Sequence, residues 1–251
     1  MPQFLDQMEN RLLLEKTPVR VVSLVPSITE YLIDLGVHVI GRTKFCVHPV
    51  ESVQNITVIG GTKNFRFSMI DQLEPDLIIG NKEENYQEGI TRLKASFPVW
   101  MSDINSPPDA VEMMRSLSVL LDRQVQGEIL TAGYQKKLEE IKGTESGSVL
   151  YLIWQNPYMA AGKKTYINSF LIHQGYDNVV QKARYPEITA DTLAEIQPDH
   201  ILLSSEPFPF KSVHIEALRQ MLPNANIRLV NGEFYSWYGS RLAKLKDETI
   251  V

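Results

Sequence analysis

Short apolar runs and longer amphipathic stretches alternate along this chain, a pattern that predicts an α/β protein. Residues 20–25 form a β-branched apolar run, which is typical of a buried strand. The helix predicted after this run ends at Gly36, and a second strand over residues 37–41 follows at once. A strand–helix–strand unit with such short connections implies a parallel sheet.

The second half of the chain repeats the order of elements found in the first half. The pattern of residues 68–80 predicts a helix, a Pro-Asp turn and a strand, and residues 191–203 predict the same three elements in the same order. A helix-favouring stretch over residues 107–142 separates the two halves. The sequence therefore predicts two similar α/β lobes with central parallel sheets, at residues 1–106 and 143–251, joined by a single long backbone helix.

Charge and motif content exclude several classes of function. The net charge is −5 and no Lys/Arg-rich run occurs, which argues against a nucleic-acid partner. The sequence contains no phosphate loop, no nucleophile elbow and no dinucleotide fingerprint. We therefore expect a binding protein without catalytic residues, with no required cofactor, and a monomer.

The first eighteen residues bear on location. They begin with acidic and polar residues, and Leu12–Leu14 is their only apolar run. A secretory signal needs a basic start and about 7–15 apolar residues. Taken as written, the chain is expected to stay in the cytoplasm.

The candidate ligand-binding residues follow the predicted strands. Ligands of open α/β sheets lie beyond the carboxyl ends of the strands, so two facing lobes would form a cleft there. Aromatic rings with a few polar groups suit a large, flat, partly apolar ligand. The residues expected to contact that ligand are Phe45, Lys63, Asn81, Glu83, Trp154, Tyr158, Tyr185, Glu206, Phe208 and Trp237.

Several candidates have a structural reading that competes with a functional one. Ser27 and Glu30 fit a helix capping box, which explains both without a ligand. Cys46 and His48 are weak metal candidates, because two donors do not make a site and a lone Cys is usually a packed side chain. Glu83 is as readily a solvated loop residue as a ligand contact.

Four segments carry a family resemblance. Arg20-Val-Val-Ser-Leu-Val-Pro-Ser-Ile-Thr-Glu, Gly60-Gly-Thr-Lys, Leu73-Glu-Pro-Asp-Leu-Ile and Ile196-Gln-Pro-Asp-His-Ile resemble periplasmic binding proteins for vitamin B12 and iron-siderophore complexes. The resemblance implies two α/β lobes joined by a backbone helix. It also implies a periplasmic substrate-binding protein of an ABC importer, with a metal-containing ligand such as cobalamin, haem or a ferric siderophore.

One departure from the family pattern favours an alternative function. The resemblance implies an acidic residue on each lobe for docking on the membrane permease, and Ser68 and Asp191 stand at those positions. One acidic charge is therefore missing. The alternative is a cytoplasmic ligand sensor or carrier that has the same fold and no transporter partner.

Overall fold

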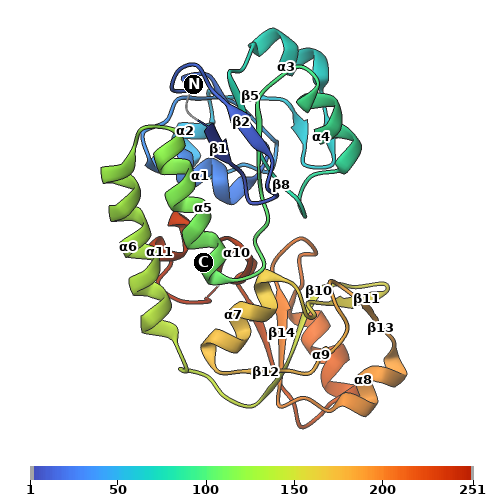
Figure 1. Cartoon of the computed structure of the whole chain (residues 1–251). Coiled ribbons are helices and arrows are strands. Elements are labelled where there is room, and N and C mark those ends of the chain that lie inside the picture. Colours follow the sequence, from blue (N-terminus) through green and yellow to red (C-terminus); the bar gives the residue numbers. More distant parts are fainter. Residues whose placement is uncertain (1–2, 250–251) are drawn as a thin grey trace. The chain divides into compact units, whose positions relative to one another are not determined.

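The computed structural model describes residues 3–249 and contains two compact α/β units (Figure 1). Unit 1 comprises the chain up to Ile104, together with Pro108–Gln135 and Tyr238–Arg241. Unit 2 comprises Asn105–Pro107, Lys136–Trp237 and the chain from Leu242 on. Each unit has its own sheet and its own buried core.

The sheet of unit 1 confirms the predicted parallel arrangement. Its strands follow the order β5 (Thr57–Val58), β4 (Val39–Arg42), β3 (Val21–Ser23), β8 (Leu77–Asn81) and β9 (Val99–Ser102). All these neighbours pair in parallel, and β3 and β8 are buried along their whole length, as central parallel strands are. The unit also contains α1 (Pro26–Asp34), α2 (Val50–Val53), α3 (Phe67–Leu73), α4 (Gln87–Lys94) and the hairpin of β6 (Gly60–Gly61) and β7 (Asn64–Phe65).

The predicted capping box at the start of α1 is wrong. The helix begins at Pro26, so Val25 is the N-cap and Ser27 lies inside the first turn. Proline suits the first helical position because its fixed φ is helical and it lacks an N–H group that would need a partner. Glu30 is buried, and its Oε1 lies 3.6 Å from Nη1 of Arg241.

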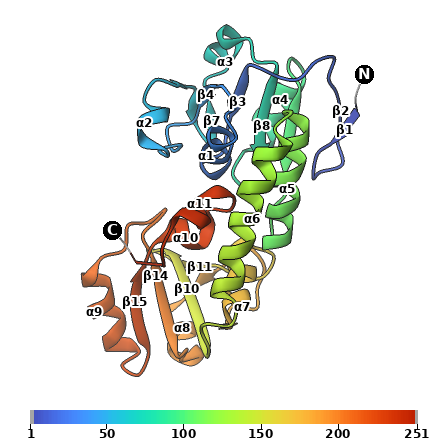
Figure 2. The ribbon, with the colours of Figure 1, turned by 90° about the vertical axis from the view of Figure 1, so that its left-hand side faces the viewer.

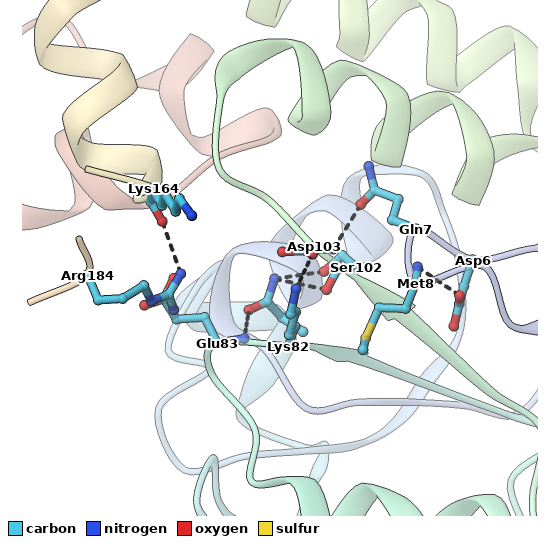
Figure 3. A network of polar contacts seen from close by, with 10 residues as sticks. Asp6, Gln7, Met8, Lys82, Glu83, Ser102, Asp103, Lys164 and Arg184 are labelled. Atoms are coloured by element: carbon cyan, nitrogen blue, oxygen red, sulfur yellow. Dashed lines mark hydrogen bonds and ion pairs between the residues drawn. The ribbon is translucent and has the colours of Figure 1, made fainter. Parts of the chain in front are cut away.

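An N-terminal hairpin that the sequence did not predict covers the edge of this sheet. Strands β1 (Gln3–Leu5) and β2 (Arg11–Leu13) pair antiparallel. The backbone N–H of Gln7 donates to the Met101 carbonyl at 3.1 Å, and the Met101 N–H donates to the Asp6 carboxylate at 3.1 Å. Asp6 also accepts the Met8 N–H at 2.9 Å (Figure 3). Residues 3–13 thus belong to the fold of unit 1 and satisfy backbone groups of an edge strand.

Unit 2 contains a mixed sheet. Its strands follow the order β13 (Glu187–Ile188), β11 (Tyr158–Ala160), β10 (Ser148–Trp154), β14 (His200–Ser204) and β15 (Asn226–Val230), and β12 (Asp177–Asn178) pairs with β10. The pairs of β10 with β12 and β14, and of β14 with β15, are parallel, as predicted. The pairs that involve β11 are antiparallel. Two- and three-residue strands are too short to show a period, so the sequence did not reveal β11 and β13.

The helices of unit 2 largely match the predicted ones. They are α7 (Tyr166–Gln174), α8 (Ala190–Ile196), α9 (Ser212–Met221) and α10 (Gly232–Ser236), and α9 packs beside β15 (Figure 2). The helix α11 (Ser240–Lys244) begins in unit 1 and continues into unit 2. Helix α7 is followed by Gly175, whose φ of 106° is the left-handed conformation that glycine adopts most readily. Across all of these elements, no helix within residues 3–249 is long and apolar enough to cross a membrane.

The segment predicted as one connecting helix forms two helices. They are α5 (Pro107–Leu120) and α6 (Gln124–Ile141), which lie side by side (Figure 2). Asp122 has a φ of 54°, and the Arg123 N–H donates to the Ser118 carbonyl at 2.8 Å, which closes a Schellman motif. A Cβ added to Gly127 would lie 2.2 Å from Cβ of Ser118, so this glycine permits the close approach of the helices. Within α6 the division between unit 1 and unit 2 falls between Gln135 and Lys136.

The repeated Pro-Asp turns have the same structural role in both units. The carboxylate of Asp76 accepts the backbone N–H groups of Val19 and Arg20, just before β3. The carboxylate of Asp199 accepts the N–H and the hydroxyl of Ser148 at 2.7 Å, at the start of β10. In each unit the Pro-Asp turn therefore joins the amino ends of two neighbouring parallel strands.

We expect Asp199→Asn to lower stability at neutral pH. Hydrogen bonds from Ser148 hold the pKa of Asp199 below its ordinary value. A carboxyl group whose pKa is lower in the folded state stabilises the protein above its unfolded pKa, and this stabilisation disappears as the pH falls through the folded pKa. Urea unfolding should show a lower midpoint for the variant at pH 7, and the difference should shrink below about pH 4. A difference that stays constant across this range, or one equally large for the exposed-site control Asp177→Asn, would contradict the prediction.

Candidate functional site

The candidate site of unit 2 lies where three of its parallel strands end. Strands β10, β14 and β15 end at Trp154, Ser204 and Val230, and parallel strands share the same carboxyl edge. Of the residues that the sequence singled out, Trp154 ends β10, and Tyr158, Glu206, Phe208 and Trp237 lie in the segments that follow these three strands. The predicted ligand cleft between the two lobes stays a prediction.

An exposed tryptophan and three neighbouring rings form an aromatic cluster at this edge. Trp154 is 40% exposed, and its ring meets the Phe208 ring edge-on at 5.6 Å between centroids. Phe208 in turn packs against Phe210 at 4.8 Å and against His214 at 5.4 Å. The sequence predicted Trp154 and Phe208 but missed Phe210 and His214. The Phe208-Pro-Phe210 spacing was a usable signal, because the two rings share one turn of the loop.

Glu206 and Trp237 hold each other in place. The indole Nε1 of Trp237 donates to Oε1 of Glu206 at 2.8 Å, and the Ser236 hydroxyl donates to the same oxygen at 3.2 Å. Trp237 is only 7% exposed. Both residues were predicted to contact the ligand. The structure shows that the two side chains position each other through this hydrogen bond, and their contact with a ligand stays a prediction.

The helix α10 packs closely on the loop that carries Glu206. A Cβ added to Gly232 would lie 2.5 Å from Cγ of Glu206 and 2.6 Å from Oγ of Ser204, so this position requires glycine. The Gly232 N–H donates to the Ser205 hydroxyl at 2.9 Å. Ser204, at the end of β14, accepts the buried Tyr151 hydroxyl at 3.0 Å. The strand ends, the loop and α10 therefore form one rigid support for the exposed rings.

The two remaining aromatic candidates of unit 2 are half-buried. Tyr158 begins β11, and its hydroxyl accepts a weak hydrogen bond of 3.5 Å from Nε2 of Gln155. Tyr185 precedes β13, and the guanidinium of Arg184 lies 5.9 Å from its ring centroid. Tyr158 packs, like Phe208, against the buried core of this unit.

In unit 1 the carboxyl ends of β8 and β9 are joined by a polar network (Figure 3). Asn81 is buried, and its Nδ2 donates to the Ser102 hydroxyl at 3.0 Å while its Oδ1 accepts the Glu83 N–H at 2.8 Å. Lys82 pairs with Asp103 at 2.5 Å. Asn81 thus orders the loop that follows β8, and this contact explains its burial without a ligand.

Lys63 and Phe45 lie on exposed loops of unit 1. The Lys63 ammonium donates to the Glu83 carbonyl at 2.5 Å, which links two of the predicted ligand contacts to each other. Phe45 is 50% exposed, and the Lys44 ammonium lies 4.9 Å from its ring centroid. Phe45 is thus the one aromatic residue among the predicted contacts of this unit, and its ring is accessible.

The side chains of Cys46 and His48 form hydrogen bonds with different residues. The Cys46 thiol is buried between the hydroxyls of Thr29 at 3.0 Å and Thr43 at 3.2 Å, and burial raises its pKa. Nε2 of His48 accepts a hydrogen bond of 2.9 Å from Nη2 of Arg241. No group of three or more His, Cys, Asp or Glu side chains suited to a metal ion occurs within residues 3–249. The structural reading of Cys46 and His48 is therefore favoured.

Tyr238 extends the polar edge of unit 1. It is buried, and its hydroxyl lies near Ser27, in the first turn of α1, and Ser102, at the end of β9. Burial raises the pKa of this hydroxyl far above its ordinary value. The contact brings a residue close to the C-terminus onto the first sheet, and local sequence patterns give no signal of such a pairing.

The sequence from residue 21 to residue 223 matches the family model described as "Periplasmic binding protein". The match spans far more than half of the chain. The chain belongs to the periplasmic binding protein family. This result confirms the resemblance found in the sequence, and the two α/β units with parallel strands are the fold that the resemblance implies.

One curated protein and two solved structures are similar to this chain. An uncharacterized ABC transporter substrate-binding lipoprotein, YvrC of Bacillus subtilis, is 23% identical over 220 residues, which cover 80% of this chain and 68% of that protein. The periplasmic heme-binding protein RhuT from Roseiflexus has a TM-score of 0.77 at 21% identity, over 90% of this chain and 94% of that one. The periplasmic vitamin B12 binding protein BtuF of Vibrio cholerae has a TM-score of 0.78 at 15% identity, over 91% and 93%.

Proposed function

We propose that this protein is the substrate-binding protein of an ABC importer and that it binds a metal-containing ligand. The proposed ligand classes are corrinoids such as cobalamin, haem, and ferric siderophores or similar chelates. Family membership supports solute binding as the general activity, and the curated relative is described as an ABC transporter substrate-binding protein. Solved structures of similar fold are heme-binding and vitamin B12-binding proteins, which supports a macrocyclic ligand.

The exposed ring of Trp154, which packs on the partly buried Phe208, is the observation that carries the proposal. A tryptophan that is 40% exposed at a strand end leaves much apolar surface in contact with water, and a flat ligand would cover that surface. The rigid support under the rings lowers the entropy cost of binding, because the rings are already ordered. We further propose Phe45 and Lys63 of unit 1 as ligand contacts, since both are exposed at loops that follow strands.

A membrane permease and a location outside the cytoplasm belong to the same proposal. Ser68 and Asp191, the positions implied for docking, are both exposed in the first turns of α3 and α8. Docking through Asp191 alone would retain one of the two acidic contacts. An extracytoplasmic location fits the family description and the lipoprotein relative better than the cytoplasmic one suggested by the first eighteen residues.

We expect Trp154→Ala to weaken ligand binding threefold to tenfold without a large loss of stability. A good ring contact contributes about 0.5–1.5 kcal/mol beyond area burial, and 1.4 kcal/mol is a factor of ten in affinity. The side chain is 40% exposed, so its removal leaves no large cavity. Tryptophan fluorescence titrations with haemin, cyanocobalamin and a neutral ferric tris-hydroxamate, followed by melting curves, would measure both effects.

The matched control is Ile172→Ala, which removes another exposed apolar side chain of unit 2, 56% exposed and located on α7. It should leave affinity unchanged. If none of the three probes binds the parental protein, the proposed ligand classes are wrong. If a probe binds and Trp154→Ala binds it as tightly as the parental protein does, the aromatic cluster is not the contact surface.

A further inference from the structure

Two loops of unit 2 are tied together by backbone hydrogen bonds. The Lys163 N–H donates to the Lys182 carbonyl at 2.9 Å, and the Arg184 N–H donates to the Lys163 carbonyl at 2.8 Å. Nη1 of Arg184 donates to the Lys164 carbonyl at 3.0 Å (Figure 3). A Cβ added to Gly162 would lie 2.1 Å from the Lys182 carbonyl oxygen, so glycine allows this close contact. The loops therefore form one ordered unit.

This loop pair concentrates positive charge in an acidic protein. Lys163, Lys164 and Lys182 are all exposed, and the net charge of the chain is −5. In the part of the chain that the structure describes, none of these three ammonium groups forms a salt bridge. Asp177 is the only acidic residue between residues 155 and 186, and it pairs with Ser148 at the opposite, amino end of the sheet.

The N-terminus of α7 adds to the positive potential at the same place. Lys163 and Lys164 precede the N-cap Thr165, whose side chain accepts the Asn168 N–H at 3.1 Å. Residues 166–169 are uncharged, so no carboxylate offsets the positive end of the helix dipole. Three ammonium groups and a helix N-terminus on ordered backbone would attract an anion.

We propose that Lys163, Lys164 and Lys182 form a cationic site that binds carboxylate groups of an anionic metal chelate. This inference rests on the proposed function and refines it, because it favours a carboxylate-bearing ligand such as an iron porphyrin over a neutral chelate. Arg184 is a positioning residue, since its guanidinium holds the loop of Lys164.

The cationic site lies within reach of a ligand on the aromatic cluster. Trp154 is opposite Met159 in the antiparallel pair of β10 and β11, and Lys163 lies four positions after Met159 in the chain. The Cα atoms of Trp154 and Lys163 are therefore no more than about 20 Å apart, given about 5 Å between paired strands and about 3.6 Å per extended residue. A macrocycle that stacks on Trp154 can direct its charged side groups toward the lysines.

The test compares haemin, an iron porphyrin with two free carboxylates, with its dimethyl ester, which has the same macrocycle and no free carboxylate. The parental protein should bind haemin about tenfold more tightly than the ester, from several exposed charge contacts of modest strength. The triple variant Lys163→Gln/Lys164→Gln/Lys182→Gln should lose this preference and keep its melting temperature. The preference of the parental protein should also weaken as salt is added.

The control variant Lys94→Gln/Lys136→Gln/Lys142→Gln removes the same net charge from exposed lysines elsewhere and should keep the preference. Equal affinity of the parental protein for haemin and the ester, or a preference that survives in the triple variant, would overturn the inference and leave the proposed function intact. Binding of cyanocobalamin or a neutral ferric tris-hydroxamate without binding of haemin would have the same consequence. Failure of every probe would overturn the proposed function, and the inference with it.

Discussion

Trp237→Ala should lower the free energy of unfolding by about 3–5 kcal/mol, as expected for truncation of a buried aromatic side chain. The side chain is 7% exposed, so its loss leaves a cavity. Its indole N–H also donates to the Glu206 carboxylate at 2.8 Å, and hydrogen bonds to charged groups contribute about 1.5–3 kcal/mol. Differential scanning calorimetry should show a melting temperature lower by about 6–20 °C.

Two further variants separate packing from hydrogen bonding at this position. Trp237→Phe keeps much of the ring and removes the N–H donor, so we expect a loss of about 1–2 kcal/mol. Trp154→Ala removes a tryptophan that is 40% exposed and should melt close to the parental protein. If Trp237→Ala melts normally but binds haemin or cyanocobalamin poorly, Trp237 is a ligand contact, as the sequence suggested, and its positioning role is wrong.

Glu248→Ala is expected to lower the stability of unit 2 by about 2–3 kcal/mol, since it removes one partner of a largely desolvated ion pair. Nη1 of Arg228 lies 2.5 Å from Oε1 of Glu248, and the two side chains are only 31% and 20% exposed. The Tyr235 hydroxyl donates to the other carboxylate oxygen of Glu248. This carboxylate and the burial of the phenol both raise the pKa of Tyr235, so the phenol stays protonated and remains a donor. Urea unfolding followed by far-UV circular dichroism would measure the loss.

The double variant Arg228→Met/Glu248→Ala provides the control. When both charges are removed, no buried charge remains without its partner, so much of the lost stability should return. Arg228 also bonds the Tyr176 hydroxyl at 2.6 Å, and Tyr176 donates to Glu145 at 2.8 Å, so the recovery should be incomplete. If Glu248→Ala is as stable as the parental protein, the C-terminal segment contributes nothing to unit 2.

Local sequence signals predicted much of the fold. The apolar run at residues 20–25, the stop at Gly36 and the Pro-Asp turns each lie within a few residues, and the structure contains a strand, a helix end and a turn at these places. Such signals work because strand burial, helix termination and turn geometry depend mainly on neighbouring residues. The predicted extent of the connecting helix, residues 107–142, was wrong, because helix-favouring composition does not reveal where the chain turns between α5 and α6. Asp122 reverses the chain through a left-handed conformation that its own residue type does not require.

The sequence by itself thus determined the order of the α/β elements, the family and the placing of aromatic residues after strands. Only the tertiary structure decided which of those aromatic residues are accessible. Trp154 and Trp237 both follow predicted strands, yet Trp237 is buried through its bond to Glu206, which lies 31 residues earlier. The hairpin of residues 3–13 likewise meets β9 across more than ninety residues. Contacts between residues that are distant in the sequence depend on how whole helices and strands pack. Neither the hydrophobic period nor the composition of the sequence predicts which residue each side chain will contact.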